Sequence, residues 1–303
     1  MGDLSTRPPH IRHQRLERVA PALVAALFVV INMAHATTER PISSTSQVPE
    51  ITLPASGEMA ITTVPKGHEG LELSARYAEN GNVLVDNIAW KISDQDQAIV
   101  YEKTTSLVKV ALRPGQYHIE ASFGTAHLKE AVSVKPGTKL GLNYVINAGA
   151  LRILPRVKGV EQFELASTSK VFALSGIEQG KLIVTSNMPG EVLNVTAGDY
   201  RIESRFASGN TVAVTDIHVK AGFMSAVNID HIAGIAKLSI GGLFDQNVQW
   251  VVTDEQGTVI NGTNAQFILK PGHYVASVWL GSQNLKSDFL IAPGETQEID
   301  LSK

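Results

Sequence analysis

Hydrophobic and polar residues alternate with a period of two in short runs along most of the chain. In the segment 117–123 every second residue is apolar, and the segments 200–206 and 274–280 have nearly the same pattern. Because successive side chains of a β-strand point to opposite faces, such runs predict strands with one buried face. Short runs rich in Val, Ile and Thr, separated by Gly and Pro, extend this prediction to an all-β protein.

Short motifs recur along the chain in the same order. "LRPGQY" ends at Tyr117 and "LKPGHY" ends at Tyr274, and each follows a tryptophan, Trp90 or Trp250, that has an aspartate four residues after it. A third copy, "VTAGDY", ends at Tyr200. A second motif follows each copy: "VKPG" at 134–137, "VKAG" at 219–222 and "IAPG" at 291–294.

These recurrences predict three tandem repeats after an N-terminal region. The middle repeat is degenerate: Phe163 stands where the tryptophan is expected, Ala197 replaces the proline, and an insertion lies near 172–181. The predicted parts of the chain are a signal peptide at 1–36, a Ser/Thr/Pro-rich linker able to hold short strands at 37–65, and β-sandwich repeats at 66–149, 150–234 and 235–303.

The repeated residues are expected to have structural roles. A Pro-Gly pair is typical of a type II turn, in which the glycine supplies a positive φ. A tyrosine at the start of a strand can reach back with its hydroxyl to the backbone, and a buried tryptophan fills a core. Two packed sheets per repeat would bury these faces. The structural residues predicted in this way are Gly115, Tyr117, Gly198, Tyr200, Gly272, Tyr274, Trp90 and Trp250.

The pattern L-x-P-G-x-Y-x-[IV]-x-A, followed by a glycine and V-x-V-x-x-G, resembles transthyretin-like, carboxypeptidase-regulatory-like and PEGA-type β-sandwich repeats of bacterial envelope proteins. The resemblance covers about 66–303, and the middle repeat departs from it by losing the proline and the tryptophan. It implies three tandem Ig-like or transthyretin-like β-sandwiches that bind, space or scaffold, and it implies no reaction.

The first residues have the pattern of an export signal. Four arginines precede an apolar run at 19–31, and Ala34 and Ala36 stand at the small-residue positions of a cleavage site. The run is shorter than the roughly 20 residues that span a bilayer. We expect a cleaved signal peptide and a periplasmic, extracellular or cell-surface location. An uncleaved signal that anchors the protein in the membrane is the alternative.

Composition excludes several classes of function. The chain has a formal net charge of −3 and no cysteine. Disulfides, thiolate catalysis and cysteine metal sites are therefore excluded. No basic patch remains after the signal peptide, so a nucleic-acid partner is not expected.

Fragments that resemble catalytic motifs are incomplete. "HEGLE" at 68–72 has a glutamate where a zinc motif has its second histidine, and "STSK" at 167–170 lacks the companion motifs of S-x-x-K enzymes. We predict no catalytic residue, no metal site and no cofactor. The alternatives are a hydrolase or metal-dependent enzyme that uses the insertion of the middle repeat, with Ser167 or Lys170, and a carrier of a small ligand between two sheets.

One position suggests a contact surface. Trp279 alternates out of phase with Tyr274, so it is expected on the outer face of its strand beside Val275. Exposed aromatic residues are frequent at interfaces. The sequence therefore favours an exported, non-enzymatic scaffold or binding protein of the bacterial envelope, with a protein or glycan as partner. Packing of Trp279 against a neighbouring repeat is the alternative.

Overall fold

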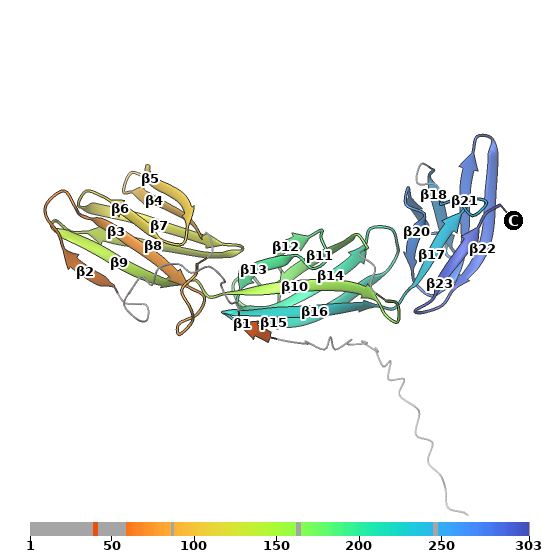
Figure 1. Ribbon diagram of the computed structural model, residues 1–303, viewed down its shortest axis with the longest axis horizontal. Helices are drawn as coiled ribbons and strands as arrows, with labels where there is room; N and C mark the ends of the chain where they lie inside the picture. The colour runs from red at the N-terminus through yellow and green to blue at the C-terminus, as the bar shows by residue number, and fades with distance from the viewer. Residues whose placement is uncertain (1–38, 42–58, 86–87, 162–164, 245–247, 303) are drawn as a thin grey trace, which may run out of the picture. The chain divides into compact units, whose positions relative to one another are not determined.

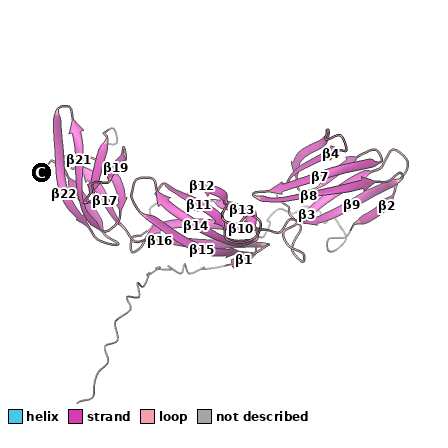
Figure 2. Ribbon diagram, turned by 180° about the vertical axis from the view of Figure 1, so that it is seen from behind, coloured by secondary structure: helices cyan, strands magenta, loops and turns pink. Residues whose placement is uncertain are grey.

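A computed structural model describes residues 39–41, 59–85, 88–161, 165–244 and 248–302. The predicted signal peptide, most of the predicted linker and Phe163 lie outside the described residues. Every regular element within these ranges is a β-strand, so the predicted all-β fold class is confirmed (Figures 1 and 2). The described residues all belong to one unit of the chain, Asn32–Lys303.

The first two sheets enclose one hydrophobic core and form the first sandwich. Their strand orders are β2-β9-β3-β6 and β5-β4-β7-β8. β2 lies within the predicted linker. The strands are β2 (Ala60–Thr63), β3 (Gly70–Arg76), β4 (Ile88–Asp94), β5 (Ile99–Thr105), β6 (Val108–Ala111), β7 (Gly115–Phe123), β8 (Ala126–Val134) and β9 (Thr138–Val145).

The second sandwich has the strand orders β1-β16-β10-β13 and β12-β11-β14-β15. One of its edge strands, β1, also comes from the predicted linker. The strands are β1 (Glu39–Pro41), β10 (Ala148–Val157), β11 (Ser167–Ala173), β12 (Leu182–Ser186), β13 (Val192–Thr196), β14 (Gly198–Phe206), β15 (Val212–Val219) and β16 (Phe223–His231).

The third sandwich has the orders β20-β17-β23 and β19-β18-β21-β22. The strands are β17 (Gly234–Ser239), β18 (Trp250–Asp254), β19 (Val259–Gly262), β20 (Gln266–Leu269), β21 (Gly272–Leu280), β22 (Gln283–Ile291) and β23 (Thr296–Asp300).

One pairing rule holds in all three sandwiches. β3 pairs in parallel with β9, β10 with β16, and β17 with β23. Each of these first strands also pairs in antiparallel fashion with a later strand, β6, β13 or β20. Parallel neighbours need a long connection. Here the connection is the rest of the sandwich, including the whole second sheet.

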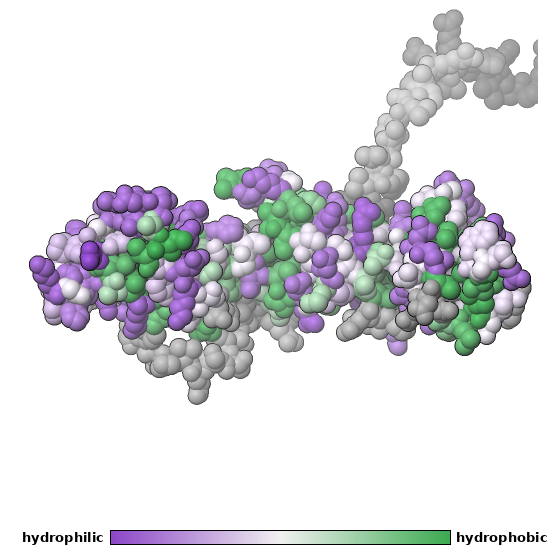
Figure 3. Space-filling model, turned by 90° about the horizontal axis from the view of Figure 1, so that it is seen from above, coloured by the Kyte–Doolittle hydropathy of each residue, from purple (hydrophilic) through white to green (hydrophobic). Residues whose placement is uncertain are grey.

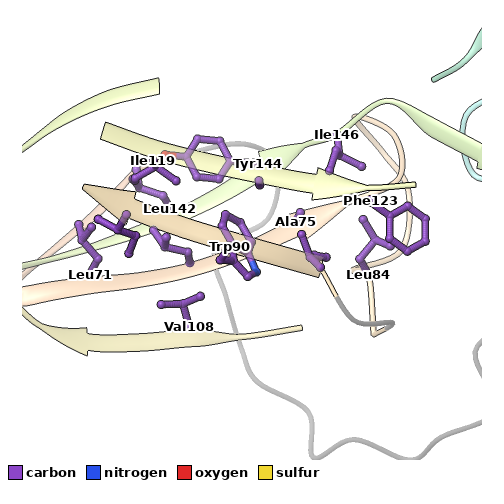
Figure 4. Close-up of a cluster of buried hydrophobic side chains, with 14 of the residues drawn as sticks. Leu71, Ala75, Leu84, Trp90, Val108, Ile119, Phe123, Leu142, Tyr144 and Ile146 are labelled. Carbon is purple, nitrogen blue, oxygen red and sulfur yellow. The ribbon is translucent and has the colours of Figure 1, made fainter. Parts of the chain in front are cut away.

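The tryptophans and tyrosines of the motifs lie in the cores. Trp90 and Trp250 are 1% and 0% exposed. Figure 4 shows Trp90 among buried side chains of the first sandwich, and its ring nitrogen donates a hydrogen bond to the carbonyl of Thr105 at 3.0 Å. The hydroxyls of Tyr117, Tyr200 and Tyr274 donate to the carbonyls of Arg113, Thr196 and Lys270, in each case four residues earlier.

The glycine of the first motif does not occupy a type II turn, so the turn assignment is wrong. Gly115 and Gly198 have no positive φ, whereas Gly272 has a φ of 155°, a positive value that favours glycine but is far from the roughly 80° of a type II turn. All three open a strand. Gly115 is already part of the ladder, opposite Val134. Pairing with the next strand therefore holds this glycine in an extended conformation.

The type II turns lie in the second motif instead. Gly137, Gly222 and Gly294 have φ values of 67°, 79° and 73°. The N–H of the residue after each glycine donates to the carbonyl three residues earlier, at 3.2, 3.2 and 3.3 Å. This is the hydrogen bond of a β-turn with glycine at its second central position. Each turn begins the last strand of its sandwich.

Replacement of Gly137 by alanine tests this assignment. Its Cβ would meet only the carbonyl oxygen of Val64, at 3.7 Å, so the cost comes from the left-handed backbone alone. We expect Gly137→Ala to lower the free energy of unfolding by about 1–2 kcal/mol in urea titrations. The matched control is Gly115→Ala, whose Cβ would lie 3.8 Å from the Tyr117 ring. This substitution should change the free energy of unfolding by less than about 0.5 kcal/mol. Equal losses would contradict the assignment.

Candidate functional site

The two residues of the enzyme alternative do not form a site. Ser167 and Lys170 both lie on β11, where burial alternates along the strand. Ser167 is 4% exposed and Lys170 is exposed, so their side chains point to opposite faces of the sheet. A serine inside the sandwich cannot meet both a substrate and the lysine amine.

The "HEGLE" segment is structural as well. The carboxylate of Glu69 accepts hydrogen bonds from the backbone N–H groups of Gly137 and Gly67, at 3.0 and 2.6 Å. These bonds, that of Gly137 first, lower the pKa of Glu69. Glu72 pairs with Lys109 at 3.1 Å. Among the described residues, no group of three or more His, Asp or Glu side chains is placed to hold a metal ion.

A hollow of about 790 Å³ lies over Glu69 in the first sandwich. It is formed by loop residues, including Lys66, Arg113 and Pro136, and not by the space between two sheets. The carrier alternative requires a cavity between sheets. The carboxylate that lines this hollow is held in place by two backbone N–H groups, those of Gly137 and Gly67.

A buried polar cluster that sequence reasoning missed lies in the second sandwich. His231 is 1% exposed, and its Nδ1 lies 2.8 Å from Thr211 Oγ1 and its Nε2 3.1 Å from Ser204 Oγ. The Phe206 ring lies 4.5 Å away, centroid to centroid. Ser204 is 0% exposed. Its hydroxyl touches an imidazole as in a hydrolase, but no substrate can reach it, so the cluster is a structural one.

Burial lowers the pKa of His231 to about 4, although nearby Asp230 acts in the opposite direction. The neutral imidazole is the form that suits this site. Two hydroxyl partners on separate segments can satisfy a neutral ring, one by donating and one by accepting. No motif in the sequence marks this residue, because its partners come from β14 and from the segment before β15.

We expect His231 to make stability depend on pH. Because its folded pKa lies below the ordinary value of about 6.5, the unfolded chain binds the proton first, and stability falls as pH drops from about 6.5 to 4. The loss between pH 7.5 and 4.5 should be about 2–3 kcal/mol greater in the wild type than in His231→Gln. Urea unfolding at both pH values measures this difference. Identical pH dependence in the two proteins would show that the ring titrates normally.

The predicted interface residues share the outer face of one sheet. Trp279 is 62% exposed and Val275 is half-buried, and both lie on β21 with Ser277 between them. The residue opposite Trp279 is Asn284, and the residues opposite Val275 are Thr253 and Asp288. The face is therefore a strand surface on which one large aromatic ring is exposed, with small, polar and charged residues beside it on the neighbouring strands.

Two further apolar side chains on this face were not singled out by sequence. Leu290 is 52% exposed, opposite His273 on the neighbouring strand, and Val259 is 53% exposed, opposite Thr253. Leu290 and Val259 alternate out of phase with the buried residues of β22 and β19. This alternation is the sequence pattern that could have predicted their exposure. Elsewhere, Figure 3 shows hydrophobic residues in separate groups between hydrophilic ones on the face that it displays.

The structure contains no helix in its described ranges that is long and apolar enough to cross a membrane.

No protein-family model matches the chain, and no curated protein matches its sequence. Among solved structures, it is similar to the Bacillus anthracis TIE protein, with 16% identity, a TM-score of 0.25, and coverage of 75% of this chain and 49% of that chain. The chain thus spans about half the length of that protein.

Two pilins are also similar. The major pilin subunit BcpA of Bacillus cereus has 11% identity and a TM-score of 0.24, with 80% of this chain and 99% of that chain covered. A streptococcal ancillary pilin has 12% identity and a TM-score of 0.26, with 80% and 98% covered. At such TM-scores the assignment of the fold rests on the strand pairings of the chain itself.

Proposed function

We propose that the protein is an exported, non-enzymatic scaffold of the bacterial envelope that presents a binding surface for a protein or a glycan. In this proposal the chain is divided into three β-sandwich modules at 66–149, 150–234 and 235–303. They would be modules of the transthyretin-like or PEGA-type kind that the Pro-Gly-x-Tyr motif resembles. Export by the signal at 1–36 would place them in the periplasm or on the cell surface.

The observation that carries the proposal is the exposure of Trp279 on a regular strand. An indole ring that is 62% exposed buries little of its apolar area in the chain itself, so a partner gains that area on binding. The neighbouring Asn284, Asp288 and His273 offer hydrogen bonds at the rim. The paired strands already fix the backbone of this surface, so binding has to order only side chains.

The positions of the candidate nucleophiles considered among the described residues support the non-enzymatic part of the proposal. Ser167 and Ser204 are both buried, and Lys170 lies on the other face of the sheet from Ser167.

Affinity capture from a bacterial envelope fraction tests the proposal. We expect the wild type to retain a reproducible protein or glycan partner and Trp279→Ala to bind it at least about tenfold more weakly, the loss of one central aromatic anchor. The matched control is Ile99→Ala on β5, which removes another exposed apolar side chain, 54% exposed, from a different sandwich. It should bind like the wild type.

Both substitutions lie at exposed positions, so unfolding free energies should stay within about 0.5 kcal/mol of the wild type. Unchanged binding by Trp279→Ala would remove this face as the site. The absence of any reproducible partner, together with turnover of a substrate by the purified protein, would overturn the proposed function.

A further inference from the structure

An added strand covers the same edge in the first two sandwiches. β2 pairs antiparallel with the start of β9, with Thr63 opposite Thr138 and Thr62 opposite Lys139. β1 pairs antiparallel with the start of β16 in the same way. In both cases pairing begins at the first residue after the turn glycine. The corresponding pairs of the second sandwich are Pro41 with Phe223, Arg40 with Met224 and Glu39 with Ser225.

The third sandwich has no such strand among its described residues. Its first sheet contains three strands, and β23 lies at the edge. The residues after the turn glycine Gly294 are Glu295, Thr296 and Gln297. By the equivalence of the turn glycines, these are the positions at which β2 and β1 pair in the other two sandwiches.

The backbone of β23 is set up to accept a strand. The N–H of Ile235 on β17 donates to the carbonyl of Glu295 at 2.8 Å, and the N–H of Leu301 donates to Ser239 at 2.9 Å. Backbone groups alternate between the two sides of a strand. The N–H and C=O groups of Thr296 and Glu298 therefore point away from β17. Both residues are exposed, and an open edge of this kind is a template for pairing.

The described residues directly before β17 are too few to form a strand that covers this edge. Only residues 146–147 separate β9 from β10, and only 232–233 separate β16 from β17. A strand immediately before β10 or β17 is thus ruled out, whereas β2 directly precedes β3 in the first sandwich. The second sandwich takes its added strand from Glu39–Pro41, far upstream in the chain. The second sandwich thus shows that an added strand can come from a distant segment.

We propose that residues 39–41 can leave β16 of their own chain and bind β23 of a second copy, antiparallel and in the register that β1 has on β16. That register places Pro41 opposite Glu295, Arg40 opposite Thr296 and Glu39 opposite Gln297. The contact joins different surfaces of the two copies. Each copy can therefore bind one neighbour through β23 and another through residues 39–41, which gives an open, head-to-tail series of chains.

Charge favours this occupant. In the proposed register Arg40 lies diagonal to Glu298, and diagonal neighbours on one face of a sheet are within reach of long side chains. On β16 the equivalent diagonal position is Ala226, which offers no charge. Glu39 lies opposite a neutral polar residue in both places, Ser225 or Gln297. The proposed register on β23 therefore offers a diagonal carboxylate, where the equivalent position of β16 is an alanine.

Self-association of the full chain, measured by sedimentation over a range of concentrations, tests the proposal. Thr296→Pro removes an N–H from the open edge and leaves the groups that face β17 intact. We expect it to weaken association at least about tenfold. Thr296→Val keeps the N–H and should associate like the wild type. A chain that is monomeric throughout, or association that Thr296→Pro does not change, would overturn the proposal.

A charge exchange keeps the test independent of any folding defect in the proline variant. Arg40→Glu and Glu298→Lys should each weaken association about three- to tenfold, in keeping with an exposed ion pair replaced by repulsion. The two changes combined should restore it. Failure of the combination to restore association would contradict the register.

The lack of cysteine in the chain allows a direct measurement of the contact. A mixture of Glu39→Cys and Gln297→Cys chains should form a disulfide-linked pair on oxidation. The matched mixture of Glu39→Cys with Gln283→Cys, on the edge strand of the other sheet, should not. Equal yields in the two mixtures would overturn the proposal. A disulfide formed within one monomeric chain that carries both Glu39→Cys and Gln297→Cys would also overturn the proposal.

Discussion

Each sandwich of this protein depends on the parallel pairing of its first strand with its last. The pairs are β3 with β9, β10 with β16 and β17 with β23. Each pair brings the end of a sandwich back beside the strand at its beginning. Because the chain ends each sandwich next to the strand where it began, the following one can start after two residues. The turn at Gly137, Gly222 or Gly294 sets where the last strand starts, which explains why this motif recurs.

The sequence predicted the fold class and the side chains that fill the cores, because those features follow from local alternation. Tyr117 and Trp90 repeat with their surroundings, and the physical role of a buried ring can be inferred without tertiary structure. The choice between two Pro-Gly motifs could not be inferred in the same way. Gly115 and Gly137 have the same local context, and only the ladder partner of Gly115 on β8 decides that it is extended.

Features that depend on distant segments were beyond the sequence. His231 and Ser204 belong to different strands, and nothing in their local sequence marks them as partners. The pairing of Glu39–Pro41 with β16 joins segments that the whole first sandwich and most of the second separate in the chain. By contrast, the outward phase of Trp279 on β21 follows from its position relative to Tyr274. The outer face of a sheet can thus be inferred from alternation, whereas an edge and its occupant cannot.

Native-state hydrogen exchange in low concentrations of urea tests most directly whether the first and last strands close each sandwich together. The amides of β3 and β9 are about 70 residues apart in the chain but share one ladder. If the account is right, they lose protection with the same free energy of opening and the same dependence on urea. If β3 exchanges through an opening that leaves β9 protected, the parallel pair is not what closes the sandwich.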